Sequence, residues 1–329
     1  MRPRRDAPAP RPAPRARPAL PLRFAVPALG AALALVLLSP MGAAQRGGDD
    51  GADDDADAAA TTRELPAVEA PPELDARQQA KLDRALDKLR NSNAERRAET
   101  EADVIGFGRG AIPALLDAAS TTHEGKQAGL VVCLAALVDL RDREIVAAGL
   151  TSEHVVLRRF AAVAVGKLGL PEQLDALPPL LADEDEIVRI EAALSLVTHG
   201  REQALPHLIA VYDSDWQPRV LAALPGVVDK GDHRALVALL TPDPERAQFQ
   251  PDAVAAEQLA TVRMLHAIGD QHAVIALRRA LDISNNLVQR GAIDALRDIL
   301  EDKPPLEAGS IFAQVAEVER LKQLGAGGR

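Results

Sequence analysis

The sequence predicts an all-α protein, a right-handed α-solenoid of about six to seven helical hairpins, and three observations lead to this fold class. The segment GDHRALVALL at Gly231 returns almost unchanged as GDQHAVIALR at Gly269. A glycine followed by polar residues and an apolar ladder recurs with a period near 31 residues, which is typical of repeat proteins. Apolar residues make up 47% of the chain but aromatic residues only 2%. Cores of small aliphatic residues favour closely packed helices over sandwiches and barrels.

Further copies of the glycine motif begin at Gly108, Gly169 and Gly200. The interval between Gly108 and Gly169 equals two periods, which places one degenerate copy near DLRDREIVAAGL. The interval between Gly231 and Gly269 exceeds one period, and the proline-rich segment TPDPERAQFQPD supplies the excess. The array of repeats therefore spans residues 93–303.

Each repeat is expected to contain a helix, a glycine turn, a second helix and a short link with Asp or Thr. Asp and Ser at the helix starts can cap free N–H groups, and glycine permits the left-handed turn. Pro113, Pro178 and Pro206 are expected in the first turns of second helices, where the missing N–H has no partner to lose. A hairpin this short cannot bury its apolar face alone, so neighbouring repeats must stack.

The regions flanking the array have different compositions. Residues 73–92 and 304–329 are expected to form an N-terminal cap helix and a C-terminal cap helix with a tail. Residues 45–72 are rich in Gly, Asp, Ala and Pro and read as an acidic disordered linker. The segment DDGADDDAD is not expected to be a calcium loop, because it lacks the ligand offsets and the closing Glu of an EF-hand.

Residues 1–44 are expected to be a secretory signal. A basic proline-rich start precedes the apolar run FAVPALGAALALVLL and small residues. The predicted location is therefore the periplasm or the exterior, and the alternative is a chain anchored through residues 24–38. Residues 1–44 carry seven Arg and one Asp, so their removal changes the formal charge from −10 to −16. Such a charge disfavours nucleic acid, and no membrane contact is expected beyond the possible anchor.

Three segments resemble HEAT repeats, specifically the short bacterial variety that also occurs in phycobilisome bilin lyases. They are VLRRFAAVAVGKLG, IVRIEAALSLVTHG and PRVLAALPGVVDKG, which end at Gly169, Gly200 and Gly231. Residues that match the family's arginine and its small packing position are Arg158, Arg189, Arg219, Ala161, Ala192 and Ala222. The resemblance implies a stack of hairpins that binds a partner.

No catalytic, metal or cofactor site is predicted. The seven histidines include no close ligand pair, and His233 and His272 are interpreted as solvent-exposed residues at helix starts. Cys133 lies in an apolar segment and is expected to be a buried hydrophobic residue. The DEDE segment at 183–186 fits the N-terminus of a helix, where carboxylates are favoured.

The function predicted from the sequence is an exported, non-catalytic scaffold that binds a protein or peptide. The second helices are expected to line a concave face, with Tyr212 and Trp216 either anchoring the partner or packing inside. The alternative, implied by the resemblance, is an accessory subunit or a lyase-like enzyme of the bilin-lyase type. The candidate partner-binding residues are His207, Tyr212, Trp216, His233, Arg234, His272, Arg278 and Arg279.

Overall fold

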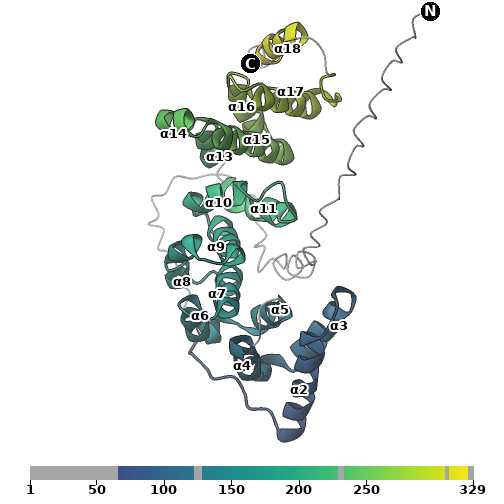
Figure 1. The fold of residues 1–329 in the computed structure, drawn as a ribbon, viewed down its shortest axis with the longest axis vertical. Helices are drawn as coiled ribbons and strands as arrows, with labels where there is room; N and C mark the ends of the chain where they lie inside the picture. Colours follow the sequence, from purple (N-terminus) through teal and green to yellow (C-terminus); the bar gives the residue numbers. More distant parts are fainter. Residues whose placement is uncertain (1–65, 122–127, 229–232, 308–310, 325–329) are drawn as a thin grey trace, which may run out of the picture.

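The computed structural model describes residues 66–121, 128–228, 233–307 and 311–324. Within these ranges the chain forms α-helices and short 3-10 helices and no strand. Figure 1 shows the helices stacked along one axis, from α2 (Ala76–Arg90) to α18 (Ile311–Gln323). The predicted all-α stack is confirmed, whereas its right-handed sense remains a prediction. The predicted signal and residues 45–65 of the predicted linker lie outside the described residues.

Each hairpin consists of a first helix, a turn and a second helix. The first helices are α3 (Ala94–Ile105), α5 (Ala128–Leu137), α7 (Val155–Leu168), α9 (Glu186–Thr198), α11 with α12 (Gln217–Ala223 and Pro225–Val228), α15 (Pro251–Ile268) and α17 (Asn286–Glu301). The second helices are η1 with α4 (Gly108–Ala111 and Ile112–Thr121), η2 with α6 (Leu140–Asp142 and Arg143–Leu150), α8 with η3 (Pro171–Asp175 and Pro178–Ala182), η4 with α10 (Glu202–Ala204 and Leu205–Ile209), α13 (Arg234–Leu240), α16 (Gln271–Ala280) and α18. The described residues thus form seven hairpins.

The turns follow the chemistry that the sequence indicated. Gly108, Gly169, Gly200 and Gly269 all have positive φ, between 61° and 76°. Every L-residue with a Cβ is strained in this conformation, which explains the recurrent glycine. The degenerate copy between Gly108 and Gly169 forms the hairpin of α5 and α6, and the proline-rich insertion forms α14 (Pro244–Phe249).

The ends of the first helices are capped by side chains from the next hairpin. Lys167 on α7 donates to the carbonyl oxygens of Ala135 (2.7 Å) and Ala136 (3.0 Å) at the end of α5. His199 Nε2, just after α9, lies 2.8 Å from the carbonyl oxygen of Gly166 on α7. Carbonyls at helix ends have no partner within the helix, so these contacts join successive hairpins through the backbone.

The stack bends toward the first helices. In Figure 1, α3 and α5 at one end and α11 and α17 at the other project beyond α7 and α9 on the same side. The prediction that the second helices line the concave side is therefore wrong. Gly166 on α7 brings this helix so close to Ser195 on α9 that an added Cβ would lie 2.3 Å from the Ser195 Oγ. The two first helices are therefore in close contact at this point.

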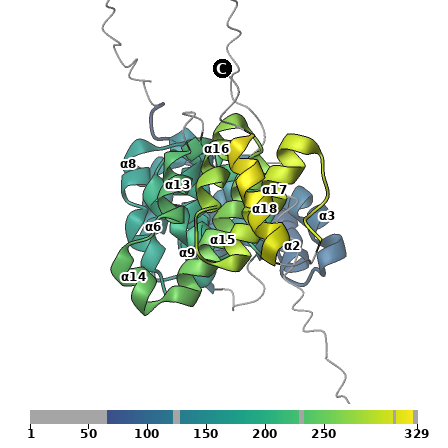
Figure 2. The ribbon, with the colours of Figure 1, turned by 90° about the horizontal axis from the view of Figure 1, so that it is seen from above.

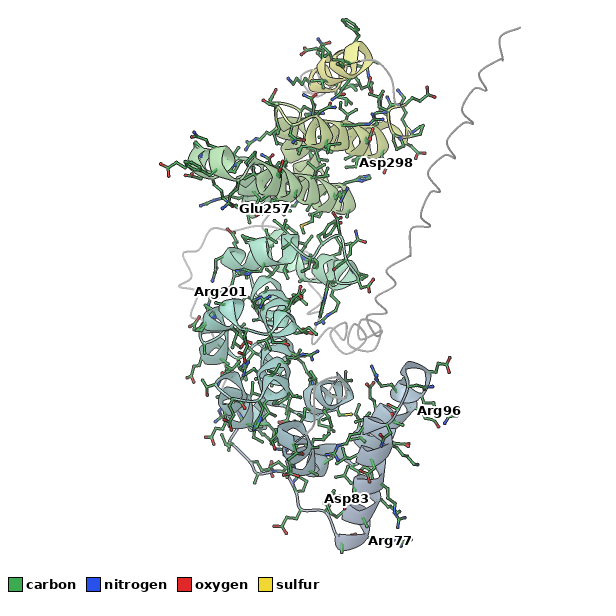
Figure 3. The ribbon with its side chains drawn as sticks, in the orientation of Figure 1. Arg77, Asp83, Arg96, Arg201, Glu257 and Asp298 are labelled. Atoms are coloured by element: carbon green, nitrogen blue, oxygen red, sulfur yellow. The ribbon has the colours of Figure 1, made fainter. Side chains whose placement is uncertain are left out.

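The interior is built mainly from Ala, Leu, Val and Ile along all the hairpins. Figure 2 shows the stack from above, with the helices of successive hairpins overlapping. Charged side chains such as Asp83, Arg201 and Asp298 lie at the outside (Figure 3). Cys133 is fully buried, as predicted, and burial raises the pKa of its thiol to about 12. Ala161 and Ala192 are buried packing positions, but Ala222 is exposed and its neighbour Ala223 takes the buried place. The predicted register is thus wrong by one residue in α11.

Candidate functional site

Two of the three arginines that match the family position serve the scaffold. Arg158 donates to the carbonyl oxygens of Ser152 (2.9 Å) and Glu153 (3.0 Å), in the link before its own helix. Arg189 repeats this geometry with the carbonyl oxygens of Asp183 (2.7 Å) and Glu184 (3.1 Å). Both arginines thus hold the backbone of the links in place.

The third arginine, Arg219, departs from this pattern. It forms a two-pronged ion pair with Glu191 of α9, at 2.6 and 2.5 Å, and both side chains are buried. Its guanidinium carbon also lies 5.0 Å from the centre of the Trp216 ring. Arg159 on α7 is only 8% exposed and forms no ion pair within the described part of the chain. Burial lowers the pKa of Arg159, while Glu191 and Asp185 oppose this shift.

Tyr212 and Trp216 pack within the stack. Tyr212 is 1% exposed, and its hydroxyl donates to the carbonyl oxygen of Arg263 at 3.4 Å. Trp216 is half-buried beside Arg219. Tyr212 therefore packs inside the stack, which is one of the two roles that the sequence left open for it. Among the histidine candidates, His207 is exposed on α10 and does not belong to the groove described next.

The two nearly identical segments noted in the sequence form opposite walls of one groove. This groove, about 270 Å³ in volume, lies between α13 and α16 on the side of the second helices. Its lining residues are Arg234, Val237, His272, Ile275, Ala276 and Arg279. The structure therefore brings together three of the predicted residues, Arg234, His272 and Arg279.

His233 lies behind the groove and corrects a prediction. It was expected to be solvent-exposed, but it is 2% exposed and adopts a left-handed backbone conformation with φ 46°. Its Nε2 lies 2.7 Å from Asp270 Oδ1 at the start of α16, and its ring meets that of His272 edge-on at 5.9 Å. The reason for burial is the neighbouring copy: the Asp270 that caps α16 also binds His233, a contact between residues 37 positions apart.

The polar groups around His233 are incompletely satisfied. Its Nδ1 is buried and has no hydrogen-bond partner among the residues that the structure describes, and a non-glycine residue in this backbone region is strained. Burial raises the pKa of Asp270, but hydrogen bonds from the Ala273 N–H and from His233 outweigh it and lower the pKa overall. Asp270 is thus held as an acceptor, which fixes the position of the His233 ring.

The groove is cationic. None of its six lining residues is acidic, and Arg279 is exposed and makes no ion pair within the described residues. Arg278 does not line the groove; it is half-buried, and its Nε has no hydrogen-bond partner within the described part of the chain. Ile275, 46% exposed, adds an apolar contact between the charged groups. This combination can hold a carboxylate beside an apolar side chain.

The fold and the groove define the class of the protein: an α-helical repeat protein with a small cationic groove between two hairpins. A family model of HEAT repeats matches residues 143–224, from α6 to the end of α11. The chain therefore contains HEAT repeats, which confirms the resemblance seen in the sequence. No curated protein matches the chain.

None of the helices described is both long and apolar enough to cross a membrane. The described His, Cys, Asp and Glu side chains include no group of three or more that could hold a metal ion.

Proposed function

We propose that the protein is a non-catalytic scaffold whose groove between α13 and α16 binds an acidic segment of a partner polypeptide. The observation that carries this proposal is the convergence of Arg234, His272 and Arg279 around Ile275. Arginine binds carboxylates through paired, charge-assisted hydrogen bonds. The surrounding chain has a formal charge of −10, so this positive groove is a local exception that selects where an acidic segment docks.

The size of the groove favours a peptide over a cofactor. Pockets for drug-sized ligands have volumes of roughly 300–1,000 Å³. The groove, at about 270 Å³, is below this range and suits one or two side chains of a longer segment. The exposed Ile275 offers such a segment an apolar contact next to the carboxylate contacts.

The proposed cellular setting is outside the cytoplasm. It is supported by the basic, apolar and small-residue pattern of residues 1–44. The acidic character of the chain supports a polypeptide partner over nucleic acid or an anionic membrane.

The proposal is tested with a panel of labelled peptides of matched length that carry acidic, neutral or basic side chains beside one leucine. Binding to the full chain is measured by fluorescence anisotropy at low and high salt. We expect the acidic peptides to bind most tightly, and more weakly as salt rises. Arg279→Glu should weaken their binding by about tenfold or more, which corresponds to one lost hydrogen bond between charged groups.

Arg201→Glu is the matched control. Arg201 is exposed, makes a surface ion pair with Asp175 and does not line the groove. Arg201→Glu imposes the same change in net charge as Arg279→Glu. Because it leaves the groove intact, the affinity of this variant for the acidic peptides should stay within about twofold of that of the unmodified chain. Equal losses in the two variants, or no preference for acidic peptides, would refute the groove as the binding site.

A further inference from the structure

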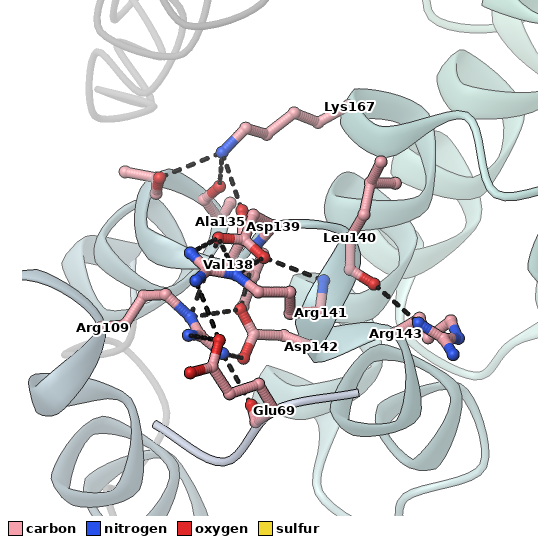
Figure 4. Close-up of polar contacts among 11 residues, drawn as sticks. Glu69, Arg109, Ala135, Val138, Asp139, Leu140, Arg141, Asp142, Arg143 and Lys167 are labelled. Carbon is pink, nitrogen blue, oxygen red and sulfur yellow. Dashed lines mark hydrogen bonds and ion pairs between the residues drawn. The ribbon is translucent and has the colours of Figure 1, made fainter. Parts of the chain in front are cut away.

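The N-terminal end of the described chain lies on a cluster of arginines far from the groove (Figure 4). We call residues 66–74 the strap, and Arg109, Arg141 and Arg143 the arginine cluster. The strap has no regular secondary structure before α2 begins at Ala76. The three arginines donate hydrogen bonds to three oxygen atoms of the strap. Arg143 donates to the carbonyl oxygen of Pro66 at 2.6 Å. Arg109 donates to the carbonyl oxygen of Glu69 at 2.7 Å, and Arg141 to the Glu69 carboxylate at 2.9 Å.

The solenoid holds the arginines of the cluster in position without help from the strap. Arg109 pairs with Asp142 through two hydrogen bonds of 2.7 and 3.1 Å, and Asp142 is 1% exposed. Arg141 pairs with Asp139, which also caps η2. The guanidinium N–H groups of Arg109 and Arg141 that bind the strap are those that Asp142 and Asp139 do not use. A site prepared in this way loses little freedom when a ligand arrives.

A glycine completes the seat of the strap. An added Cβ on Gly110 would lie 2.6 Å from Leu74 Cδ2 and 3.0 Å from the carbonyl oxygen of Pro72. The backbone of the strap can therefore approach the surface only because position 110 carries no side chain. The seat thus combines shape selection for an extended segment with charge selection for a glutamate.

The strap is nevertheless held weakly. Residues 66–70 are exposed, and the side chains of Glu69 and Arg141 are 61% and 40% exposed. Surface ion pairs of this kind contribute little individually because water and salt screen them. Leu74, at the end of the strap next to α2, is partly buried against the core. Residues 66–70 depend on their connection to it, which gives a tethered ligand an effective concentration in the millimolar range. A partner segment that binds the site more tightly than the tethered strap does would displace the strap.

We propose that the arginine cluster is an exchangeable docking site for an extended segment of a partner polypeptide that carries a glutamate between prolines, and that the strap occupies this site in cis. The strap sequence PAVEAPPEL is the occupant whose contacts define the chemistry of the ligand. This site is separate from the groove and adds a second docking position to the scaffold. Its occupation by a partner would release the strap.

The test uses a nitroxide spin label on the strap of the full chain. The chain has one cysteine, Cys133, which is fully buried, so the variant Ala70→Cys directs the label to the exposed position 70. Electron paramagnetic resonance then measures the mobility of the label. We expect a restricted spectrum in the Ala70→Cys chain and a mobile one when Arg141→Ala and Arg143→Ala are added. Arg201→Ala, which removes a comparably exposed arginine elsewhere, should leave the spectrum restricted.

Exchange is tested by adding a free peptide with the sequence of residues 66–74. At several millimolar it should convert at least half of the restricted signal into the mobile one, in line with the effective concentration of the tether. The same peptide with Glu69→Lys should have no effect. Two results would overturn the proposal: a label that is already mobile in the chain with the intact cluster, or a restricted signal that the excess peptide leaves unchanged. Circular dichroism of each variant verifies that the helices remain folded.

Discussion

The buried charges of Glu191, Arg219 and Arg159 yield the most quantitative prediction. Arg159 and Arg219 are both buried, but only Arg219 pairs with the buried Glu191 carboxylate, through both of its oxygen atoms. Removing one partner of a buried ion pair costs about 3–5 kcal/mol, because the remaining charge stays buried without compensation. We therefore expect Glu191→Gln to lower the free energy of unfolding by about this amount.

Arg159 provides the internal check. Because it forms no ion pair within the described residues, Arg159→Met should be neutral or stabilising. It should also reduce the cost of Glu191→Gln by about 1 kcal/mol or more, since only one buried cation then remains unbalanced. The relevant quantity is the difference between the cost of Glu191→Gln in the two backgrounds.

The assay is urea unfolding followed by tryptophan fluorescence. Trp216 is the only tryptophan and lies against Arg219, so its emission reports on the hairpins that contain the cluster. For a slope of about 2 kcal/mol per molar urea, Glu191→Gln should lower the midpoint by about 1.5–2.5 M. Two results would refute the charge argument. One is that Glu191→Gln lowers the free energy of unfolding by less than about 1 kcal/mol; the other is that it lowers it equally in the unmodified chain and in Arg159→Met.

Two other predictions concern close packing and acid. Gly226→Ala should destabilise the fold by about 1–3 kcal/mol, because its Cβ would lie 2.2 Å from a backbone carbonyl oxygen of α9. Gly106→Ala, whose Cβ meets only atoms at 3.4 Å, should cost nothing. Chemical unfolding of the two variants measures the difference in stability. Equal stability of the two variants would contradict this. At the α17–α18 contact, hydrogen bonds from Arg320 hold the pKa values of Glu301 and Glu317 at about 2, against 4.5 ordinarily. This contribution to stability is therefore complete above about pH 4.5 and disappears as the pH falls toward 2. Thermal melts between pH 6 and pH 2 should show a smaller acid loss in Arg320→Met, and an unchanged loss would contradict the assignment.

The sequence predicted the repeating architecture well because one physical requirement recurs in every hairpin. A left-handed turn at Gly169 and Gly200 and an early proline at Pro178 and Pro206 are local features, which leave a local signature. The walls of the groove come from two segments that are visibly alike. Their similarity indicated equivalent positions in neighbouring hairpins, and adjacency in the stack placed Arg234 and Arg279 together.

What the sequence could not show are contacts between residues far apart in the chain. His233 looked like an exposed residue at a helix start because nothing local reveals Asp270 beside it. The close approach of Gly166 and Ser195 is likewise a property of two packed helices and not of either segment alone. The strap left no signal because Glu69 and Arg141 are 72 residues apart and each looks like an ordinary surface charge.

The central claim, that the groove binds an acidic segment of a partner, is tested most directly by photo-crosslinking from position 275. Ile275, which lies in the groove, is replaced by a photoreactive amino acid, and the captured sequences are read by mass spectrometry. Leu300 on α17, similarly exposed but outside the groove, carries the same group in the control. We expect cross-links from position 275 to acidic segments of one partner, and their loss when Arg279→Glu is added. Cross-links that are the same from both positions, or that persist in Arg279→Glu, would contradict it.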